Sequence, residues 1–109
     1  MTLSEPENQE VAQVEDNGMF PARRSDVVVR EIEGETLVLD GLSGKVHQFN
    51  PTAGFIWACC DGASSIIDIT RRLAAEYGVA AVTVELDVVD TIGKFQELGL
   101  LLAPRINKL

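Results

Sequence analysis

The feature that most constrains this chain is the stretch from Val46 to Gly62, VHQFNPTAGFIWACCDG, in which a strand pattern passes directly into a helix pattern. Asn50-Pro51 ends the strand, because the residue before a proline favours extended backbone and proline suits the first turn of a helix. Thr52 is then the predicted N-cap. A helix is expected up to Asp61-Gly62, with an apolar stripe at helical spacing. The stripe consists of Ala53, Phe55, Ile56, Trp57, Cys59 and Cys60.

Three short strands are predicted before this helix. The first, Asp26–Ile32, is rich in β-branched residues. Glu33-Gly34 is typical of a tight turn and leads into a second, antiparallel strand over Glu35–Asp40. Gly41–Gly44 turns the chain again, into a third strand over Lys45–Phe49. A meander of this size is not stable alone, so helices are expected to pack on one of its faces.

Two further helices are predicted after Gly62. One runs from a cap at Ser64 or Ser65 to Tyr77, and the other covers Thr83–Leu98 with its first residue as the N-cap. The apolar residues that follow, 100–102, are expected to add to the sheet edge or to cover the core. The pattern therefore predicts an α+β, winged-helix-like fold, with a three-stranded antiparallel sheet followed by three helices.

The charge of the chain is unevenly distributed. The formal net charge is −8, yet the first nineteen residues contain five acidic residues and no Lys or Arg. This predicts a disordered acidic tail over residues 1–19 and one ordered domain over residues 20–109. The acidic balance argues against nucleic-acid binding. No apolar run approaches membrane-spanning length and the N-terminus lacks a basic signal region, so a cytoplasmic protein is expected.

Few residues offer catalytic chemistry. His47 is the single histidine, and an ordinary strand residue is favoured over a general base that has no nucleophile or metal beside it. Cys59 and Cys60 are adjacent on a helix, too close for an ordinary disulfide and too few for a zinc site, which predicts reduced core thiols. The glycines sit at turns and helix ends, not in a phosphate-binding loop. We therefore expect no enzyme activity, no metal and no cofactor.

Gly93 is unusual because it lies in the middle of the third predicted helix, where glycine costs about 0.5–1 kcal/mol relative to alanine. In one interpretation, the helix flank around it, with Leu86, Val89 and Asp90, faces the free edge of the third strand across a groove. An extended peptide could then add to that edge as a further strand. In the other, Gly93 lets a segment such as Leu100–Leu102 pack close. The residues alone leave both interpretations open.

The run LVLDGLSGKVHQFNPTAGFIWACCDG, followed by a helix ending AAEYG and by a terminal ELGLL, resembles the PqqD-like family. These are small peptide-binding proteins, also described as recognition elements for ribosomally made, post-translationally modified peptides (RiPPs). The resemblance covers about Val27 to Leu102. It rests on Phe49-Asn50, the Thr52-Ala53-Gly54 turn into a helix bearing Trp57, Asp61-Gly62, Leu73 with Tyr77-Gly78, and Leu98-Gly99-Leu100.

The resemblance implies a non-catalytic protein that binds the leader segment of a precursor peptide by strand addition and presents it to a modifying enzyme. In pyrroloquinoline quinone (PQQ) biosynthesis that enzyme is a radical SAM protein, and in lasso-peptide pathways it is a leader peptidase with a cyclase. The implied peptide-binding residues are Lys45, Val46, His47, Gln48, Phe49, Leu86, Val89, Asp90 and Gly93.

Two other functions use the same layout. A winged-helix DNA-binding regulator would insert its third helix into a groove of the duplex, but here that helix carries Glu85, Asp87, Asp90 and Glu97 against Lys94 alone, which would repel phosphates. A protein–protein adaptor, or a homodimer formed through the exposed strand edge, differs from the peptide-binding interpretation only in its partner.

Overall fold

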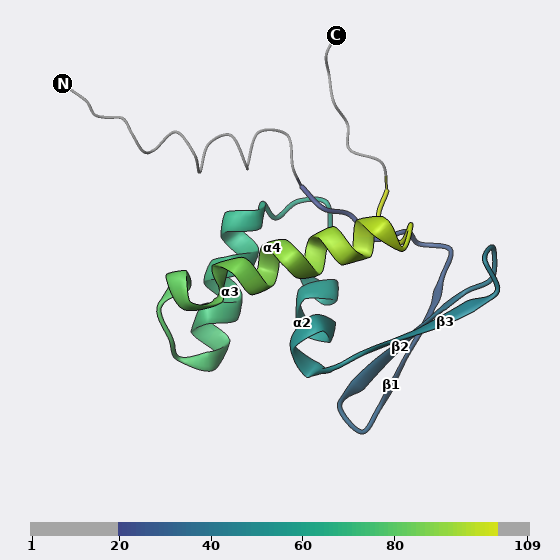
Figure 1. Ribbon diagram of the computed structural model, residues 1–109, viewed down its shortest axis with the longest axis horizontal. Helices are drawn as coiled ribbons and strands as arrows, with labels where there is room; N and C mark the ends of the chain where they lie inside the picture. The colour runs from purple at the N-terminus through teal and green to yellow at the C-terminus, as the bar shows by residue number, and fades with distance from the viewer. Residues whose placement is uncertain (1–19, 103–109) are drawn as a thin grey trace, which may run out of the picture.

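The computed structural model describes residues 20–102 of the 109-residue chain. The predicted disordered tail over residues 1–19 lies outside this range, as do residues 103–109 of the predicted domain. Three strands come first and three helices follow (Figure 1), which confirms the predicted α+β class. The elements are β1 (Val28–Ile32), β2 (Glu35–Asp40), β3 (Lys45–Phe49), α2 (Pro51–Cys59), α3 (Ile66–Tyr77) and α4 (Ala81–Glu97).

The strands form an antiparallel meander in the order β1-β2-β3. The turn between β1 and β2 consists of Glu33 and Gly34, whose φ angles of 54° and 84° suit a tight hairpin connection. β1 begins at Val28, where its ladder with β2 starts opposite Leu39, and not at the predicted Asp26. Every residue of β1 is exposed, whereas alternate residues of β2 are buried. The sheet is therefore covered on one face only, and only in part.

The start of α2 differs from the prediction. Asn50, not Thr52, is the N-cap, because its side-chain oxygen accepts a hydrogen bond of 2.8 Å from the backbone N–H of Ala53. Proline suits the first turn, so the helix begins at Pro51 itself and the cap moves to the residue before it. The hydroxyl of Thr52 instead pairs with the hydroxyl of Tyr77, which links the start of α2 to the end of α3.

The other two helices begin in different ways. Ser65 and Asp68 form a reciprocal capping box at the start of α3, which decides between the two predicted serine caps. α4 begins at Ala81, so the prediction of Thr83 as its N-cap was wrong. The backbone N–H of Thr83 donates to the carbonyl of Ala80 at 3.0 Å, which closes the first turn without any side-chain cap.

A single apolar core lies between the helices and the covered part of the sheet. α2 packs on β2 and β3, and α3 packs on α4 (Figure 1). β1 contributes no residue to this core. The buried residues of the core are Val38, Phe49, Ile56, Trp57, Cys59, Cys60, Ile66, Ile69, Leu73, Ala74, Val84, Val88, Ile92, Phe95 and Leu100.

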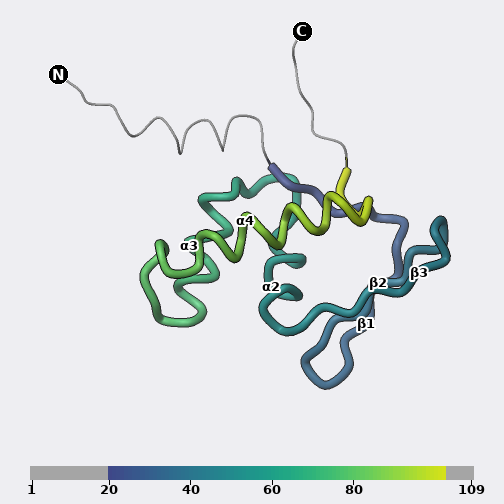
Figure 2. Tube along the Cα trace, in the orientation of Figure 1, coloured from purple at the N-terminus to yellow at the C-terminus, as the bar shows by residue number. Residues whose placement is uncertain are grey.

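The segment before β1 and the segment after α4 run side by side (Figure 2). The backbone N–H of Arg24 donates to the carbonyl of Leu100 at 3.0 Å, and that of Leu102 donates to the carbonyl of Ala22 at 2.8 Å. Leu100 is fully buried. Leu100 and the half-buried Leu101 therefore cover the core, which is one of the two predicted alternatives. Residues 100–102 pair with residues 22–24 and not with β3.

Candidate functional site

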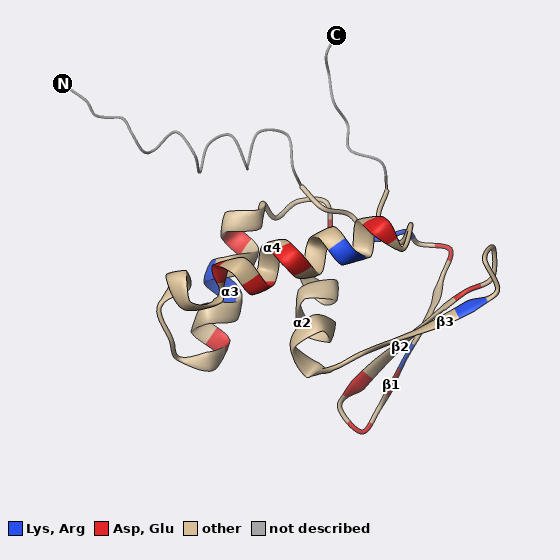
Figure 3. Cartoon of the chain, in the orientation of Figure 1, with Lys and Arg blue, Asp and Glu red and all other residues tan. Residues whose placement is uncertain are grey.

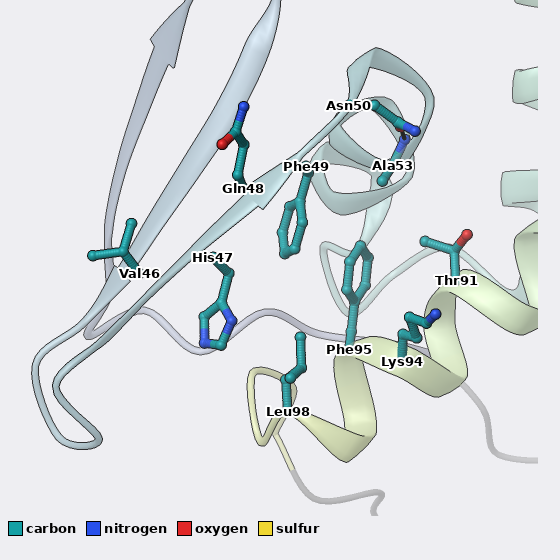
Figure 4. A pocket seen from close by; sticks show the side chains of 10 residues that line it. All are labelled: Val46, His47, Gln48, Phe49, Asn50, Ala53, Thr91, Lys94, Phe95 and Leu98. Atoms are coloured by element: carbon teal, nitrogen blue, oxygen red, sulfur yellow. Dashed lines mark hydrogen bonds between the residues drawn. The ribbon is translucent and has the colours of Figure 1, made fainter.

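A groove with a volume of about 520 Å³ lies between β3 and the C-terminal half of α4 (Figure 4). We call it the β3–α4 groove. Its position follows from the chain order, because α2 leaves the end of β3 and α4 crosses back over α2 (Figure 1). The groove is lined by Val46, His47, Gln48, Phe49, Asn50, Ala53, Thr91, Lys94, Phe95 and Leu98.

The strand alternation of β3 decides which side chains enter the groove. His47 is opposite the fully buried Val38 on β2, so its ring lies on the covered face of the sheet. Figure 4 shows His47 and Phe49 pointing toward α4, and Val46 and Gln48 pointing away from it. The latter two residues therefore border the groove mainly through their backbone.

Three aromatic rings from three different elements pack together at the groove, and two of them, Phe49 and Phe95, line it. The centroid of Phe49 on β3 lies 5.7 Å from that of Trp57 on α2 and 4.9 Å from that of Phe95 on α4. Trp57 and Phe95 meet edge to face at 5.4 Å, a favoured geometry for aromatic pairs. All three rings are buried. This aromatic cluster fixes α4 at a set distance from β3 and gives the groove an apolar base.

The edge of β3 that faces the groove is unpaired within residues 20–102, because the only ladder of β3 is with β2. In an antiparallel pair, alternate residues direct their N–H and C=O groups away from the partner strand. Backbone donors and acceptors of β3 are therefore available along the groove. Such an edge is a template for another extended segment.

Two polar groups stand out among the groove side chains. The Nε2 atom of His47 is buried and has no hydrogen-bond partner among the described residues. Lys94 on α4 is exposed and forms no ion pair with any other residue between 20 and 102. Of the side chains that line the groove, only Lys94 carries a fixed charge. The site is therefore mostly apolar, with one buried ring nitrogen and one cation to orient a ligand.

A partly buried ion pair connects the sheet to the end of α4 beside the groove. Arg24 donates to the two carboxylate oxygens of Asp40 at 3.0 and 3.1 Å, and to the carbonyl of Gly99 at 3.0 Å. The hydrogen bonds from Arg24 hold the pKa of Asp40 down to about 2, helped by the backbone N–H of Leu42. Asp26, more exposed, also pairs with Arg24 at 2.9 Å. Arg24 therefore joins β2 to the C-terminal end of the helix that forms the other wall.

The structure brings only part of the predicted site together. Val46, His47, Gln48 and Phe49 line the groove, whereas Lys45 does not. On α4 the lining residues are not those predicted: Leu86 and Asp90 are exposed, Val89 packs against the core, and Gly93 has open space where a Cβ would lie. With about 100° of rotation per residue, Leu86, Val89 and Gly93 lie about 130–170° around the helix from the middle of the groove face, and Asp90 lies about 90° from it. Peptide contact by any of the nine stays a prediction.

The groove residues that sequence reasoning missed at α4 are Thr91, Lys94, Phe95 and Leu98. These four recur at i, i+3, i+4 and i+7, which is one helix face. The signal that could have found them is Phe95 itself. A core aromatic near the end of the helix orients the adjacent face toward whatever its ring contacts, which here is Phe49.

The remaining candidate chemistry lies in the core. Cys59 and Cys60 are free and buried, as predicted. Burial raises the pKa of the Cys60 thiol to about 12, so it is a poor nucleophile at neutral pH. No cluster of three or more His, Cys, Asp or Glu side chains suited to a metal ion occurs within residues 20–102. In the same range, no helix has the length and apolarity needed to cross a membrane.

A three-stranded meander followed by three helices, with a free sheet edge across a groove from the last helix, defines a small winged-helix-like α+β domain. The family model described as "Coenzyme PQQ synthesis protein D (PqqD)" matches residues 35–101, more than half of the chain. The protein belongs to the PqqD family. Among curated proteins, none matches the chain.

Two solved structures share the fold. One, "Lasso peptide synthetase B1 complexed with the leader peptide", is 27% identical with a TM-score of 0.67, and the match covers 78% of this chain and 100% of that one. The other, "TbiB1 in Complex with the TbiA(beta) Leader Peptide", is 24% identical with a TM-score of 0.67, covering 78% of this chain and 99% of that one. Both similar structures contain a bound leader peptide.

Proposed function

We propose that this protein is a non-catalytic recognition element for a RiPP precursor. The leader segment of the precursor adds as a strand to the free edge of β3, in the groove between β3 and α4, and is presented to a modifying enzyme. The observation that carries the proposal is the unpaired β3 edge facing an apolar groove. Membership of the PqqD family and the leader peptides in both similar structures support it.

The shape of the groove favours an extended ligand. Backbone hydrogen bonds to β3 would supply affinity independent of sequence, and alternate side chains of the peptide would point toward the aromatic cluster. The buried Nε2 of His47 and the ammonium of Lys94 would select polar groups on the same face of the ligand. We therefore expect a leader that alternates apolar side chains with at least one hydrogen-bonding or acidic side chain.

The charge of α4 argues against the DNA-binding alternative. The charged residues of this helix are mostly acidic (Figure 3): Glu85, Asp87, Asp90 and Glu97 are all exposed, against Lys94 alone. Phosphates would be repelled there, and the single Lys94 faces the groove.

The proposal is tested with synthetic leader peptides taken from candidate precursor genes near the gene of this protein, titrated into the ¹⁵N-labelled full chain. We expect amide shifts in β3 and around Thr91–Leu98. A second peptide with N-methyl groups on two alternate amides should bind about tenfold or more weakly, because each lost hydrogen bond costs about 1 kcal/mol. Equal affinity for the two peptides would contradict strand addition.

Matched variants separate the two edges of the sheet. Leu98→Glu places a carboxylate at the apolar groove and should weaken leader binding about tenfold, since that group loses water when the peptide binds. Ile32→Glu makes the same type of change on the exposed edge strand β1 and should leave the affinity unchanged. Weakening by Ile32→Glu alone would place the peptide on β1 and refute the proposed site.

A further inference from the structure

A second exposed feature of α4 lies away from the groove. Val82 and Leu86 each have 74% of their surface exposed, high values for aliphatic residues in a helix. With Val89 and Gly93 they recur at i, i+4, i+7 and i+11, a spacing that places all four along one line of the helix. We call these four residues the α4 outer stripe. Because the stripe lies roughly 160° around the helix from the groove face, a ligand in the groove leaves it uncovered.

Acidic side chains border the α4 outer stripe on both sides. Glu85 lies on one side of it, and Asp90 and Glu97 lie on the other, each about 40° around the helix from a stripe residue. All three are exposed, and Figure 3 shows acidic residues along this helix. The one basic residue of α4, Lys94, lines the groove instead. The stripe is therefore an apolar surface within a rim of negative charge, a pattern typical of a protein–protein contact.

The charge and reach of the chain's own parts make them poor occupants of this surface. Residues 1–19 contain five acidic residues and no basic one, so the acidic rim would repel them. In a dimer formed through this surface, the acidic rims of the two copies would face and repel each other. Residues 103–109 include Arg105 and Lys108, but they follow Leu102, which is held beside Ala22 near the end of α4. Seven residues span at most about 23–25 Å, about the distance from Leu98 to Val82 along the helix axis, so they reach the far end of the stripe only when fully extended.

We propose that the α4 outer stripe is a docking site for a partner protein that presents aliphatic side chains flanked by Lys and Arg. The aliphatic side chains would cover Val82 and Leu86, and the cations would face Glu85, Asp90 and Glu97. Docking leaves the groove free, so one domain can hold a peptide on one side of α4 and a protein on the other. The docking site itself does not depend on the proposed function. Only the identity of the partner does: if the protein binds a leader peptide, the partner is the enzyme that acts on that leader.

The test uses a synthetic helical peptide of fifteen residues as the probe, with Leu at i, i+4, i+7 and i+11 and with Lys and Arg beside them. A scrambled peptide of identical composition is the control for charge attraction alone. With the ¹⁵N-labelled full chain we expect amide shifts around Val82–Gly93 and an affinity at least tenfold higher than that of the scrambled peptide. Leu86→Gln should abolish this difference. Leu42→Gln, which alters an equally exposed leucine in the β2–β3 turn, should preserve it.

The other outcomes each contradict the proposal. Equal binding of the two peptides would mean attraction by charge only. If the unliganded protein formed a dimer that Leu86→Gln dissociates, the occupant of the stripe would be a second copy of the chain. If Leu86→Gln, without any peptide added, shifted the amide signals of residues 1–19 or 103–109, the occupant would be one of the chain's own ends. The affinity for the leader peptide, measured on the same variants, reports separately on the groove: Leu86→Gln should not change it, and absence of leader binding to the unmodified chain would refute the proposed function without touching the stripe.

Discussion

The two edge strands of the sheet each have an unpaired edge within residues 20–102, yet they differ in burial and in what faces them. β1 is exposed along its whole length and no helix packs on it. β3 ends in the buried Phe49 and faces α4 across an apolar groove. β1 carries the exposed charged residues Arg30 and Glu31, which discourage pairing with other strands. A free edge therefore becomes a specific binding site only where a second wall supplies contacts for the ligand's side chains.

The largest effect is expected from removing the aromatic contact that holds α4 beside β3. Phe95→Ala deletes the ring that contacts both Phe49 and Trp57. We expect a loss of about 3–5 kcal/mol in the free energy of unfolding, as for other buried phenylalanines. The measurement is urea unfolding followed by Trp57 fluorescence, and Ile32→Ala on β1 is the control that should cost far less. A loss below about 1 kcal/mol for Phe95→Ala would show that the aromatic cluster does not hold the groove together.

A smaller loss is expected where α2 meets the covered part of the sheet. A Cβ added to Gly54 would lie 2.5 Å from Oγ1 and 3.3 Å from Cβ of the buried Thr36 on β2. Gly54→Ala should therefore lower the free energy of unfolding by about 1–3 kcal/mol, in spite of the better helix propensity of alanine. Combining it with Thr36→Ala tests the cause, because removal of the clashing atoms should recover part of the loss. Strictly additive effects of the two substitutions would contradict the close approach.

Part of the fold and of the candidate site could be predicted from the sequence alone. Alternating and helical periodicities predicted β2, β3 and α3 well, because burial on one face imposes those periods on the residues. The caps were harder. Pro51 shifted the start of α2 to Asn50, and α4 begins without any side-chain cap. Of the residues that line the groove, those of β3 were among the predicted site residues, whereas those of α4 were not.

The difference between the predicted residues of α4 and those that line the groove has a physical cause. A helix with apolar residues on two faces does not reveal which face meets the sheet, and that choice depends on the contact between Phe49 and Phe95, forty-six positions apart. Gly93 suggested that the flank beside it was the groove wall, but it lies where nothing approaches within 4 Å of a Cβ. Local patterns identify exposed apolar residues without identifying their neighbours.

A further difference between the two edges is the ion pair of Arg24 and Asp40, which connects the sheet to the end of α4. Arg24 lowers the pKa of Asp40 to about 2 in the folded protein, below the value of about 3.9 in an unfolded chain. The unfolded state then binds more protons between about pH 4 and pH 2, so the stabilisation is complete above that window and is lost as the pH falls through it. Asp40→Asn should flatten the acid limb of the stability profile, measured by thermal unfolding from pH 2 to 7. Glu31→Gln on β1 removes the same charge and should leave that limb intact, and an unchanged limb in Asp40→Asn would contradict a role for the pair.

The smallest expected effect concerns Gly93, on the side of α4 that faces away from both edges. Because a methyl group there would meet no other atom within 4 Å, Gly93→Ala should raise the free energy of unfolding by about 0.5–1 kcal/mol, the difference in helix propensity. Leader affinity should not change, since the groove lies on the other side of the helix. The same urea titration measures the first quantity and the leader titration the second. If Gly93→Ala weakened leader binding, the peptide would contact the flank that the sequence had indicated, and the groove defined by Thr91, Lys94, Phe95 and Leu98 would not be its complete binding site.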